Sequence, residues 1–305
     1  MDPGQETSTN DMAVCFILFN PAKSKRIVMN ALYVKNHFEI QGFPVFFLEL
    51  VYEGRQPEVN DAFHVSCNSY MFHKENLYRI LESKIPSHFT KLAFLDADIY
   101  FLNASWYSKA SELLETYDVV QPFELCHWLD LSYTISYRTA FSILCKDLKK
   151  WDCEYHHGFA WCMRRDWYKQ VGFFDCALTG GGDEFSCAAW LGDSSILSRL
   201  PTLLLNSYSS FLTHPKPKIT YIQKMEVFHL YHGSLENRQY KDRHNILCVE
   251  GQFEEIVEKK KEGLWEWKKK EIWNPVFLDY FTKRHDDAIP EKRTHSIPFW
   301  TKPKK

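Results

Sequence analysis

Continuous apolar runs, each followed by a segment of helical pattern, recur through roughly the first 120 residues of the chain. The first two runs are Met12–Phe19 and Phe43–Val51, and a helical stretch extends between them from the break at Asn20-Pro21 to about Phe38. A strand that is apolar throughout is buried on both faces, as parallel strands covered by helices are. The alternation predicts an α/β fold with a doubly wound, mostly parallel sheet.

The same signals predict further elements along the chain. They are strands at Ala62–Cys67, Lys91–Phe101, Val119–Phe123, Gly158–Arg164 and Val227–Tyr231, and helices at Met71–Leu81, Trp106–Thr116, Asp166–Val171 and Asp183–Leu191. The irregular polar and aromatic pattern of residues 124–154 predicts loops. We expect one domain over residues 12–250, and a C-terminal extension over 251–305 packed on the same domain. Helices are expected over Gln252–Asp287 and a basic tail from Ile289.

Charge and cysteine content narrow the possible classes of function. The net charge is −2, so no basic field is available to hold a nucleic-acid backbone. The nine cysteines form no CxxC pair, which suits reduced thiols in a reducing compartment. The first apolar run is too short to span a bilayer and follows an acidic, polar start, and no later run reaches transmembrane length. We therefore expect a cytoplasmic protein without a transmembrane segment.

Two aspartates, Asp96 and Asp98, interrupt the apolar strand Lys91–Phe101. Alternate strand residues point to opposite faces, but both carboxylates can approach one ligand where the backbone turns at the end of a strand. That edge is where open α/β sheets bind ligands. A divalent cation such as Mn²⁺ or Mg²⁺, which can bridge a diphosphate, is one partner for the pair. The alternative is an aspartate pair that only ends a strand.

A glycine turn, Thr179–Gly182, leads into Asp183 and Glu184 at the start of a predicted helix. Glycines such as Gly181 and Gly182 let the backbone come close to a ligand. Asp183 is then either the N-cap of this helix or a general base for an acceptor hydroxyl.

Two histidines three residues apart, His229 and His232, lie in and after another apolar run. They are either metal ligands or hydrogen-bonded structural residues. Arg238 and Arg243 follow, and a guanidinium group can hold phosphate oxygens through two parallel hydrogen bonds. The alternative for both arginines is a surface salt bridge.

An aromatic stretch that follows Tyr155 contains His157, Gly158 and Trp161. A glycine beside aromatic rings can form the floor of a sugar pocket. The same pattern also fits a core strand with outward histidines.

In their order along the chain, these features resemble the GT-A glycosyltransferases, which have a Rossmann-like fold, and in particular a bacterial and large-virus group related to the family 2 enzymes. The matching stretches are FNPAKSKRIVMN, FHKENLYRI, LAFLDADIYF, HHGFAWCMRRDWYKQVGFFDCALTGGGDEFSCAAWLG and FHLYHGSLENRQYKDRH. They cover the chain from Met12 to about Asp287. A weaker likeness is to β-1,4-galactosyltransferase-like enzymes, in which a Gly-Gly-acid motif and a C-terminal histidine occupy comparable places.

The resemblance implies a metal-dependent, inverting transfer of a hexose or pentose from a nucleotide-diphosphate-sugar, such as a UDP-sugar, to a hydroxyl of a glycan or glycoconjugate. It implies that His229 or His232 adds a metal contact and that Asp183 accepts the proton of the acceptor hydroxyl. Many relatives carry Glu-Asp at this point, so Glu184 remains a second candidate for the base. The implied donor site is Phe19, Asn20, Lys74, Asp96, Asp98, Arg238 and Arg243, the metal site is Asp96, Asp98, His229 and His232, and the acceptor or sugar pocket is His157, Gly158, Trp161, Gly181 and Gly182.

Three other classes of protein compete with this interpretation. A nucleotidyltransferase normally has a glycine-rich, basic loop after its first strand, and this chain has Asn20-Pro21-Ala22 there. A metal-dependent hydrolase could use the same aspartates and histidines, but it would turn over without an acceptor. A non-catalytic sugar-binding module would not need an acid at a glycine turn.

Overall fold

The computed structural model describes residues 11–148, 154–240 and 242–289. A seven-stranded sheet forms its centre, with the strand order β11-β6-β10-β4-β1-β2-β3. β10 is antiparallel to both of its neighbours, and the other neighbouring pairs are parallel. The predicted α/β class with a mostly parallel, mixed sheet flanked by helices is therefore confirmed. The strands of this sheet are β1 Met12–Phe19, β2 Val45–Tyr52, β3 Phe63–Cys67, β4 Lys91–Leu95, β6 Val119–Gln121, β10 Ala160–Arg164 and β11 Ile219–Tyr221.

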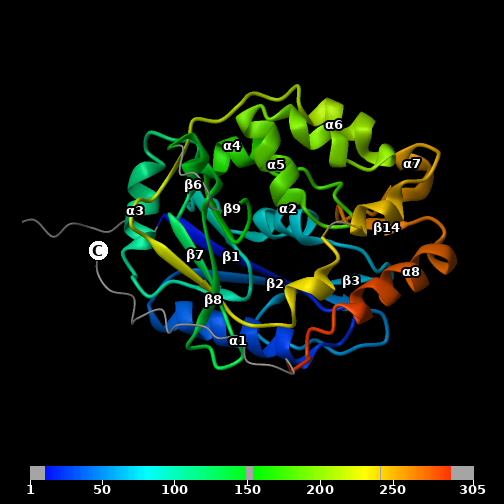
Figure 1. Ribbon diagram of the computed structural model, residues 1–305, viewed down its shortest axis with the longest axis horizontal. Helices are drawn as coiled ribbons and strands as arrows, with labels where there is room; N and C mark the ends of the chain where they lie inside the picture. The colour runs from blue at the N-terminus through cyan, green and yellow to red at the C-terminus, as the bar shows by residue number, and fades with distance from the viewer. Residues whose placement is uncertain (1–10, 149–153, 241, 290–305) are drawn as a thin grey trace, which may run out of the picture.

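Side chains along β1 alternate between two apolar cores, one on each face of this sheet. Val14 and Phe16 belong to the core that α1 and α3 cover, whereas Ala13 and Cys15 belong to the core that α2, α4 and α5 cover. Figure 1 shows α1 on one side of the sheet and α4 and α5 on the other. Successive side chains of a strand point to opposite faces, so a strand covered on both sides is apolar throughout. The helices are α1 Lys25–Ile40, α2 Lys74–Lys84, α3 Trp106–Leu113, α4 Arg165–Gln170, α5 Gly182–Leu191, α6 Leu205–Phe211, α7 Phe253–Ile256 and α8 Lys270–Lys283.

A second sheet, in the order β5-β12-β7-β8-β9, extends from the end of β4. The chain turns at Asp96–Asp98 between β4 and β5, and β5 then pairs with β12 so that His229 lies opposite Ile99. This pairing brings the aspartate turn next to His229 at the end of β12, although more than a hundred residues separate them in the sequence. The strands are β5 Ile99–Tyr100, β7 Leu125–Leu129, β8 Ser136–Ser142, β9 Tyr155–His156 and β12 Glu226–His229.

The prediction of loops over residues 124–154 was wrong, because β7 and β8 form an antiparallel pair within this segment. Trp128 lies opposite Arg138, and the guanidinium carbon of Arg138 is 4.6 Å from the centre of the Trp128 ring. The polar and aromatic residues that give the segment its irregular pattern are thus cross-strand partners on the sheet. Such pairs stabilise strands without a continuous apolar run.

The C-terminal segment is only partly helical. A short hairpin of β13 Val257–Lys259 and β14 Trp265–Trp267 stands between α7 and α8, where helix was expected. Trp267 is fully buried, and its indole nitrogen donates a hydrogen bond to the carbonyl of Tyr70, 2.8 Å away. The expected basic tail lies outside the described residues from 290 onward. Short 3₁₀ turns complete the fold at η1 Ile143–Leu148, η2 Ser194–Arg199, η3 Thr202–Leu204, η4 Leu235–Arg238 and η5 Arg243–Leu247.

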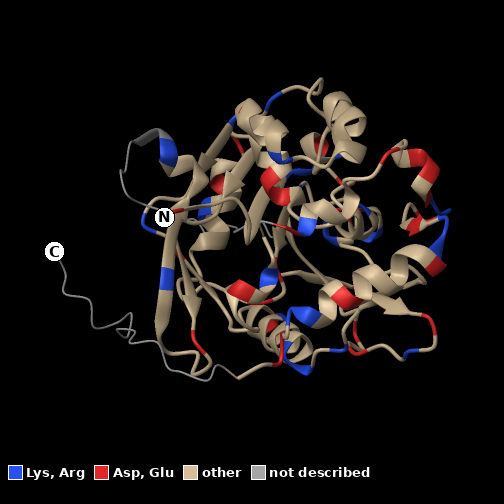
Figure 2. Cartoon of the chain, turned by 45° about the vertical axis from the view of Figure 1, so that its right-hand side comes forward, with Lys and Arg blue, Asp and Glu red and all other residues tan. Residues whose placement is uncertain are grey.

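Acidic and basic residues are interspersed over the elements visible in Figure 2. Within the described ranges, no helix combines the length and apolar character needed to cross a membrane.

Candidate active site

A cleft of about 390 Å³ opens beside the carboxyl ends of β1 and β4. Fourteen residues that the sequence analysis selected line it together, from both halves of the chain. They are Phe19, Asn20, Lys74, Asp96, Asp98, His157, Gly158, Gly181, Asp183, Glu184, His229, His232, Arg238 and Arg243.

Two residues expected in the sugar pocket do not line the cleft. Trp161 points into the apolar core, where its ring lies 5.3 Å from that of Trp190. Its indole nitrogen donates a hydrogen bond to the carbonyl of His157, 2.8 Å away. Gly182 instead allows a close approach, because a Cβ at this position would lie 2.3 Å from the carboxyl carbon of Glu75.

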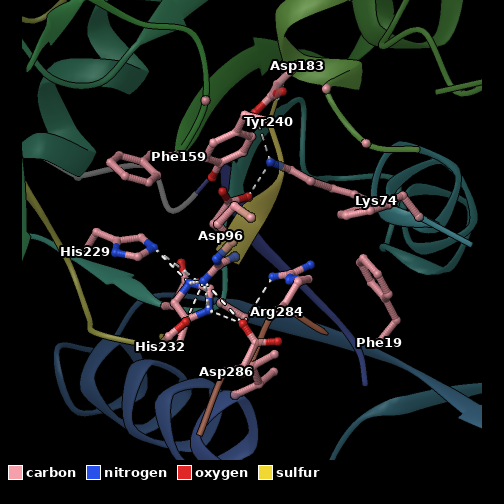
Figure 3. A pocket seen from close by; sticks show the side chains of 18 of the residues that line it. Phe19, Lys74, Asp96, Phe159, Asp183, His229, His232, Tyr240, Arg284 and Asp286 are labelled. Carbon is pink, nitrogen blue, oxygen red and sulfur yellow. Dashed lines mark hydrogen bonds and ion pairs between the residues drawn. The ribbon is translucent and has the colours of Figure 1, made fainter. Parts of the chain in front are cut away.

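Asp98, His229 and His232 form a candidate metal centre in the cleft. Figure 3 shows the two histidines close together. The Oδ2 atom of Asp98 lies 2.9 Å from Nε2 of His232 and 3.6 Å from Nε2 of His229. One ligand atom from each residue fits within 4.8 Å of the others. The Oδ1 atom of Asp98 is buried and has no hydrogen-bond partner in the described chain. A carboxylate oxygen and two imidazole nitrogens that converge in this way fit a divalent transition-metal ion.

The charge states of this cluster also suit metal binding. Burial opposes ionisation of Asp98, but the neighbouring imidazoles of His229 and His232 hold the pKa of its carboxyl well below the usual range. Burial lowers the pKa of His229 to about 3, although Asp98 opposes this change, and the lowered pKa favours the neutral form, whose lone pair a metal requires. The sequence analysis expected a contact from one histidine, and the structure places both beside Asp98.

Asp286 lies behind this cluster, in the segment that follows α8. Its Oδ1 atom is 3.4 Å from Nδ1 of His232, 3.4 Å from Nη2 of Arg238 and 3.5 Å from Nη2 of Arg284. Gly233 has a φ of 84°, and a Cβ there would meet the carbonyl of residue 285 at 2.9 Å, so this segment packs closely on the chain beyond His232. Sequence reasoning did not select Asp286, because an acidic residue near the end of a terminal helix has the pattern of an exposed one.

Lys74 joins two carboxylates across the middle of the cleft. Its Nζ atom lies 2.6 Å from Oδ1 of Asp96 and 3.3 Å from Oδ2 of Asp183. All three side chains keep between 22% and 25% of their surface exposed to the cleft. Asp96 therefore pairs with a lysine, and it is not among the three residues whose possible ligand atoms lie within 4.8 Å of one another. Burial raises the pKa of Asp96 to about 6, and Asp98 and Asp183 add to this rise while Lys74 opposes it.

Asp183 does not cap α5. The N-cap is Gly181, which adopts a φ of 84° and makes no side-chain bond to the helix. The Asp183 carboxylate accepts a hydrogen bond from the backbone N–H of Glu184 at 2.9 Å and otherwise faces Lys74. Burial acts to raise its pKa, but Lys74 and His156 outweigh this effect and hold the pKa below the usual range. The side chain is thus an ionised carboxylate that faces the cleft.

Gly158 makes room for this carboxylate, because a Cβ at residue 158 would lie 2.3 Å from Oδ2 of Asp183. Glu184 turns away toward the rim and forms an ion pair with Arg199, 2.5 Å apart. The two acids of the pair therefore have different surroundings, which the sequence could not show.

Glu75 is a second acidic residue of the cleft that the sequence analysis did not select. It belongs to the first turn of α2 and is 4% exposed. Its carboxyl group lies against Gly182, the first residue of α5. Burial raises its pKa to about 8, and Lys74 opposes this rise. Its place beside Lys74 in the FHKEN stretch is the one sequence signal that could have identified it.

Aromatic rings line another part of the cleft. The centre of the Phe19 ring lies 5.9 Å from that of Phe72 and 6.2 Å from that of Phe281. Asn20 supports the turn after β1, because its side-chain oxygen accepts a hydrogen bond from the N–H of Ser24 at 2.8 Å. Aromatic rings of this kind can stack on a flat heterocycle.

The fold and the cleft define an α/β protein with a candidate metal centre at the carboxyl edge of its parallel strands. No protein-family model and no curated protein matches the chain. Among solved structures, it is similar to a Drosophila β-1,4-galactosyltransferase 7 mutant in complex with manganese, UDP-Gal and xylobiose, at 9% identity and a TM-score of 0.41 over 87% of this chain and 98% of that chain. It is also similar to GalNAc-T7 with UDP, GalNAc and Mn²⁺, at 10% identity and a TM-score of 0.39 over 72% of this chain and 43% of that chain. These similarities are remote, and the assignment of a function depends on the geometry of the cleft.

Proposed function

We propose that this protein is a metal-dependent glycosyltransferase that moves a sugar from a nucleotide-diphosphate-sugar, such as a UDP-sugar, to a hydroxyl of a glycan or glycoconjugate. The observation that carries the proposal is the arrangement of two acidic groups in one cleft. Asp98 belongs to a candidate metal centre, and Asp183 is an ionised carboxylate outside it. Lys74 forms ion pairs with both Asp96 and Asp183 and so lies between these two carboxylates.

The metal centre is suited to stabilise the leaving group of such a reaction. Asp98, His229 and His232 would hold Mn²⁺ or Mg²⁺, and the ion would stabilise the charge of the leaving diphosphate. Arg238 lies beside His232, with Nη2 2.9 Å from Nε2 of that ring, and adds a positive charge on the same side. The ring of Phe19, in another part of the cleft, would receive the nucleobase.

Asp183 is suited to act as the general base for the attacking hydroxyl. A general base must be unprotonated at the working pH and must reach the proton that it removes. The lowered pKa of Asp183 satisfies the first condition, and its side-chain exposure of 22% in the cleft leaves it accessible to a hydroxyl. A base placed apart from the metal centre supports attack from the face opposite to the leaving group, which is the inverting mechanism. A hydrolase would use the same carboxylate to activate water, so the dependence of turnover on an acceptor distinguishes the two activities.

Binding and turnover measurements test this proposal together. Purified protein should be screened against UDP-, GDP- and CDP-sugars by thermal shift with and without Mn²⁺, since a ligand that binds the folded state raises the melting temperature. We expect one donor to give a shift that depends on Mn²⁺, and its sugar to appear on a supplied acceptor. If sugar is released at the same rate without an acceptor, the protein is a hydrolase. If no nucleotide sugar produces a shift with Mn²⁺, the proposal fails.

A further inference from the structure

Arg243 starts η5 and reaches the cleft beside the glycine turn that precedes α5. Its guanidinium carbon lies 5.0 Å from the centre of the Tyr240 ring and 5.8 Å from that of Phe72. Its Nη1 and Nη2 atoms lie 3.0 and 2.9 Å from the positions where Gly180 and Gly181 would carry a Cβ. Any larger residue in this turn would press on the guanidinium group, so the two glycines and the two rings fix its position.

The turn that carries Arg243 is anchored independently. The next residue, His244, forms a hydrogen bond through Nδ1 with the hydroxyl of Thr179, 2.9 Å away. This contact joins the start of η5 to the start of the glycine turn. The guanidinium group is therefore held before any ligand binds, which reduces the entropy that a ligand would have to overcome.

Arg243 is a buried cation without a protein anion. It is only 9% exposed, and its Nε atom has no hydrogen-bond partner within the described ranges. The other arginines of the cleft have carboxylate partners, since Arg238 and Arg284 contact Asp286 and Arg199 contacts Glu184. For Arg243, the described part of the chain offers no ion pair. A buried charge is unfavourable unless it is paired, so an anion is expected from the ligand.

The position of Arg243 relates it to Asp183 rather than to the metal centre. It contacts the glycine turn that leads directly into Asp183. Burial raises the pKa of Asp183, and Arg243 is among the cations, Lys74 foremost, that lower it. Arg238 instead lies beside the candidate metal centre, with Nη2 2.9 Å from Nε2 of His232. An anion held by Arg243 would therefore lie near the hydroxyl that loses its proton.

We propose that Arg243 binds an oxyanion of the acceptor, a carboxylate, phosphate or sulfate group close to the hydroxyl that is glycosylated. The inference rests on the proposed function and adds the chemical class of the acceptor. A planar guanidinium group binds two oxygens of such an anion in parallel, which gives both affinity and orientation. The sequence analysis expected Arg243 at the donor phosphates, and its place beside the base favours the acceptor instead.

Sugar binding to protein already loaded with Mn²⁺ and UDP tests this inference. Glucose, glucuronate, glucose 6-phosphate and glucose 6-sulfate should be titrated by calorimetry. We expect at least one anionic sugar to bind about 10- to 100-fold more tightly than glucose, the value of a charge-assisted pair of hydrogen bonds. The anion that binds best distinguishes a carboxylate acceptor from a phosphorylated or sulfated one. Arg243→Gln should remove the preference and leave binding of Mn²⁺ and UDP unchanged.

Two further variants keep this result interpretable. Arg243→Met retains an apolar stem between Tyr240 and Phe72, so a loss of anion preference there is a loss of charge and not of packing. Arg138→Gln is the matched control, because Arg138 also lines the cleft but pairs with Glu154 at 2.6 Å. It should keep the preference of the wild type.

Three results would overturn the inference. The first is wild-type protein that binds glucose as tightly as every anionic sugar. The second is an Arg243→Gln variant that loses UDP and keeps the anion preference, which would return Arg243 to the donor. The third is equal loss of preference in Arg138→Gln, which would indicate a diffuse electrostatic effect. A failure of the proposed function would be seen earlier, because the wild type would then not load with UDP, GDP or CDP in Mn²⁺.

Discussion

The carboxylate of Asp286 lies 3.4 Å from Nδ1 of His232, and Nε2 on the other side of that ring lies 2.9 Å from Asp98. A residue near the end of the described chain thus supports a histidine of the candidate metal centre from behind. A carboxylate in this position fixes the tautomer and orientation of the ring and increases its basicity as a ligand. The neighbouring Asp287 has a different role, since it accepts a hydrogen bond at 2.8 Å from the N–H of Arg26 in the first turn of α1, whose N-cap is Ser24.

We therefore expect Asp286→Asn to weaken Mn²⁺ binding by about 10- to 100-fold, the usual effect of losing such a supporting carboxylate. Calorimetric titration of the protein with Mn²⁺ measures this directly. Asp287→Asn is the matched control at the adjacent position. It should keep the affinity for Mn²⁺ and cost at most about 1 kcal/mol of stability, because the amide oxygen of asparagine can still accept a hydrogen bond from the N–H of Arg26. Unchanged Mn²⁺ affinity in Asp286→Asn would show that the contact serves only the packing of the C-terminal segment.

His229→Ala and His232→Ala should each weaken Mn²⁺ binding by more than about 100-fold, since a direct ligand contributes more than its support does. The structure places both rings at Asp98, so neither is expected to be a packing residue alone. Asp96→Asn serves as the comparison, because Asp96 pairs with Lys74. It should bind free Mn²⁺ like the wild type. If the metal affinity falls in Asp96→Asn but is unchanged in one of the histidine variants, the metal lies nearer to Asp96.

Glu75 should make the stability of the protein depend on pH. Burial raises its pKa to about 8 in the folded state, above its ordinary value of 4.5. The folded state therefore keeps the proton that the unfolded state loses, so the contribution to stability is fully present below pH 4.5 and is lost as the pH rises toward 8. Glu75→Gln, which carries no charge at any pH, should be more stable than the wild type at pH 9 by an amount of the order of 1 kcal/mol or more. Chemical denaturation at pH 5 and pH 9 measures the difference, and an equal effect at both values would contradict the assignment.

Gly158→Ala should disturb the base without touching the metal centre. The added methyl group would overlap Oδ2 of Asp183, whose present distance from the Cβ position is 2.3 Å. Because a small misplacement of a catalytic group can cost about 100-fold in rate, we expect a fall of that order in sugar transfer. Mn²⁺ titration should give the wild-type affinity. Full transfer activity in this variant would mean that Asp183 need not occupy its observed position.

The parallel part of the fold could be predicted because β1, β2 and β4 are largely buried on both faces and consist mostly of apolar residues. The strands β7 and β8 could not, since their stability depends on cross-strand pairs such as Trp128 with Arg138, and a pattern along one strand does not contain its partner. Apolar character alone also could not separate Trp161, which faces the core, from residues that face the cleft.

For the candidate site, motifs identified individual residues but not their pairing. Asp98 and His229 could each be selected from local sequence, whereas their approach depends on the pairing of β5 with β12. Asp286 carries no local signal, because Asp287 beside it is chemically identical and differs only in what it contacts. The sequence likewise could not distinguish the surroundings of Asp183 and Glu184, whereas the structure places one against Lys74 and the other against Arg199.

Asp183→Asn is expected to lower sugar transfer by about 10²- to 10⁴-fold, the usual contribution of a general base. Asparagine is nearly isosteric, and its side-chain oxygen can still accept the hydrogen bond from the N–H of Glu184. Donor binding and the melting temperature should therefore change little. Glu184→Gln, which breaks only the ion pair with Arg199 at the rim, should keep near-normal transfer because surface pairs contribute little.

Initial rates at saturating donor, measured from pH 5 to pH 8, complete this test of the base. Burial would raise the pKa of Asp183, but Lys74 and His156 hold it below the usual range, so the carboxylate stays ionised throughout this interval. The base should therefore cause no loss of rate toward pH 5. Lys74→Met removes the cation that contributes most to the low pKa, so an acid-side loss of rate should move upward in pH in that variant.

If only Glu184→Gln loses transfer, the base is Glu184. If neither variant loses it, the acceptor is activated elsewhere, and a retaining mechanism without a base at this turn becomes the better account.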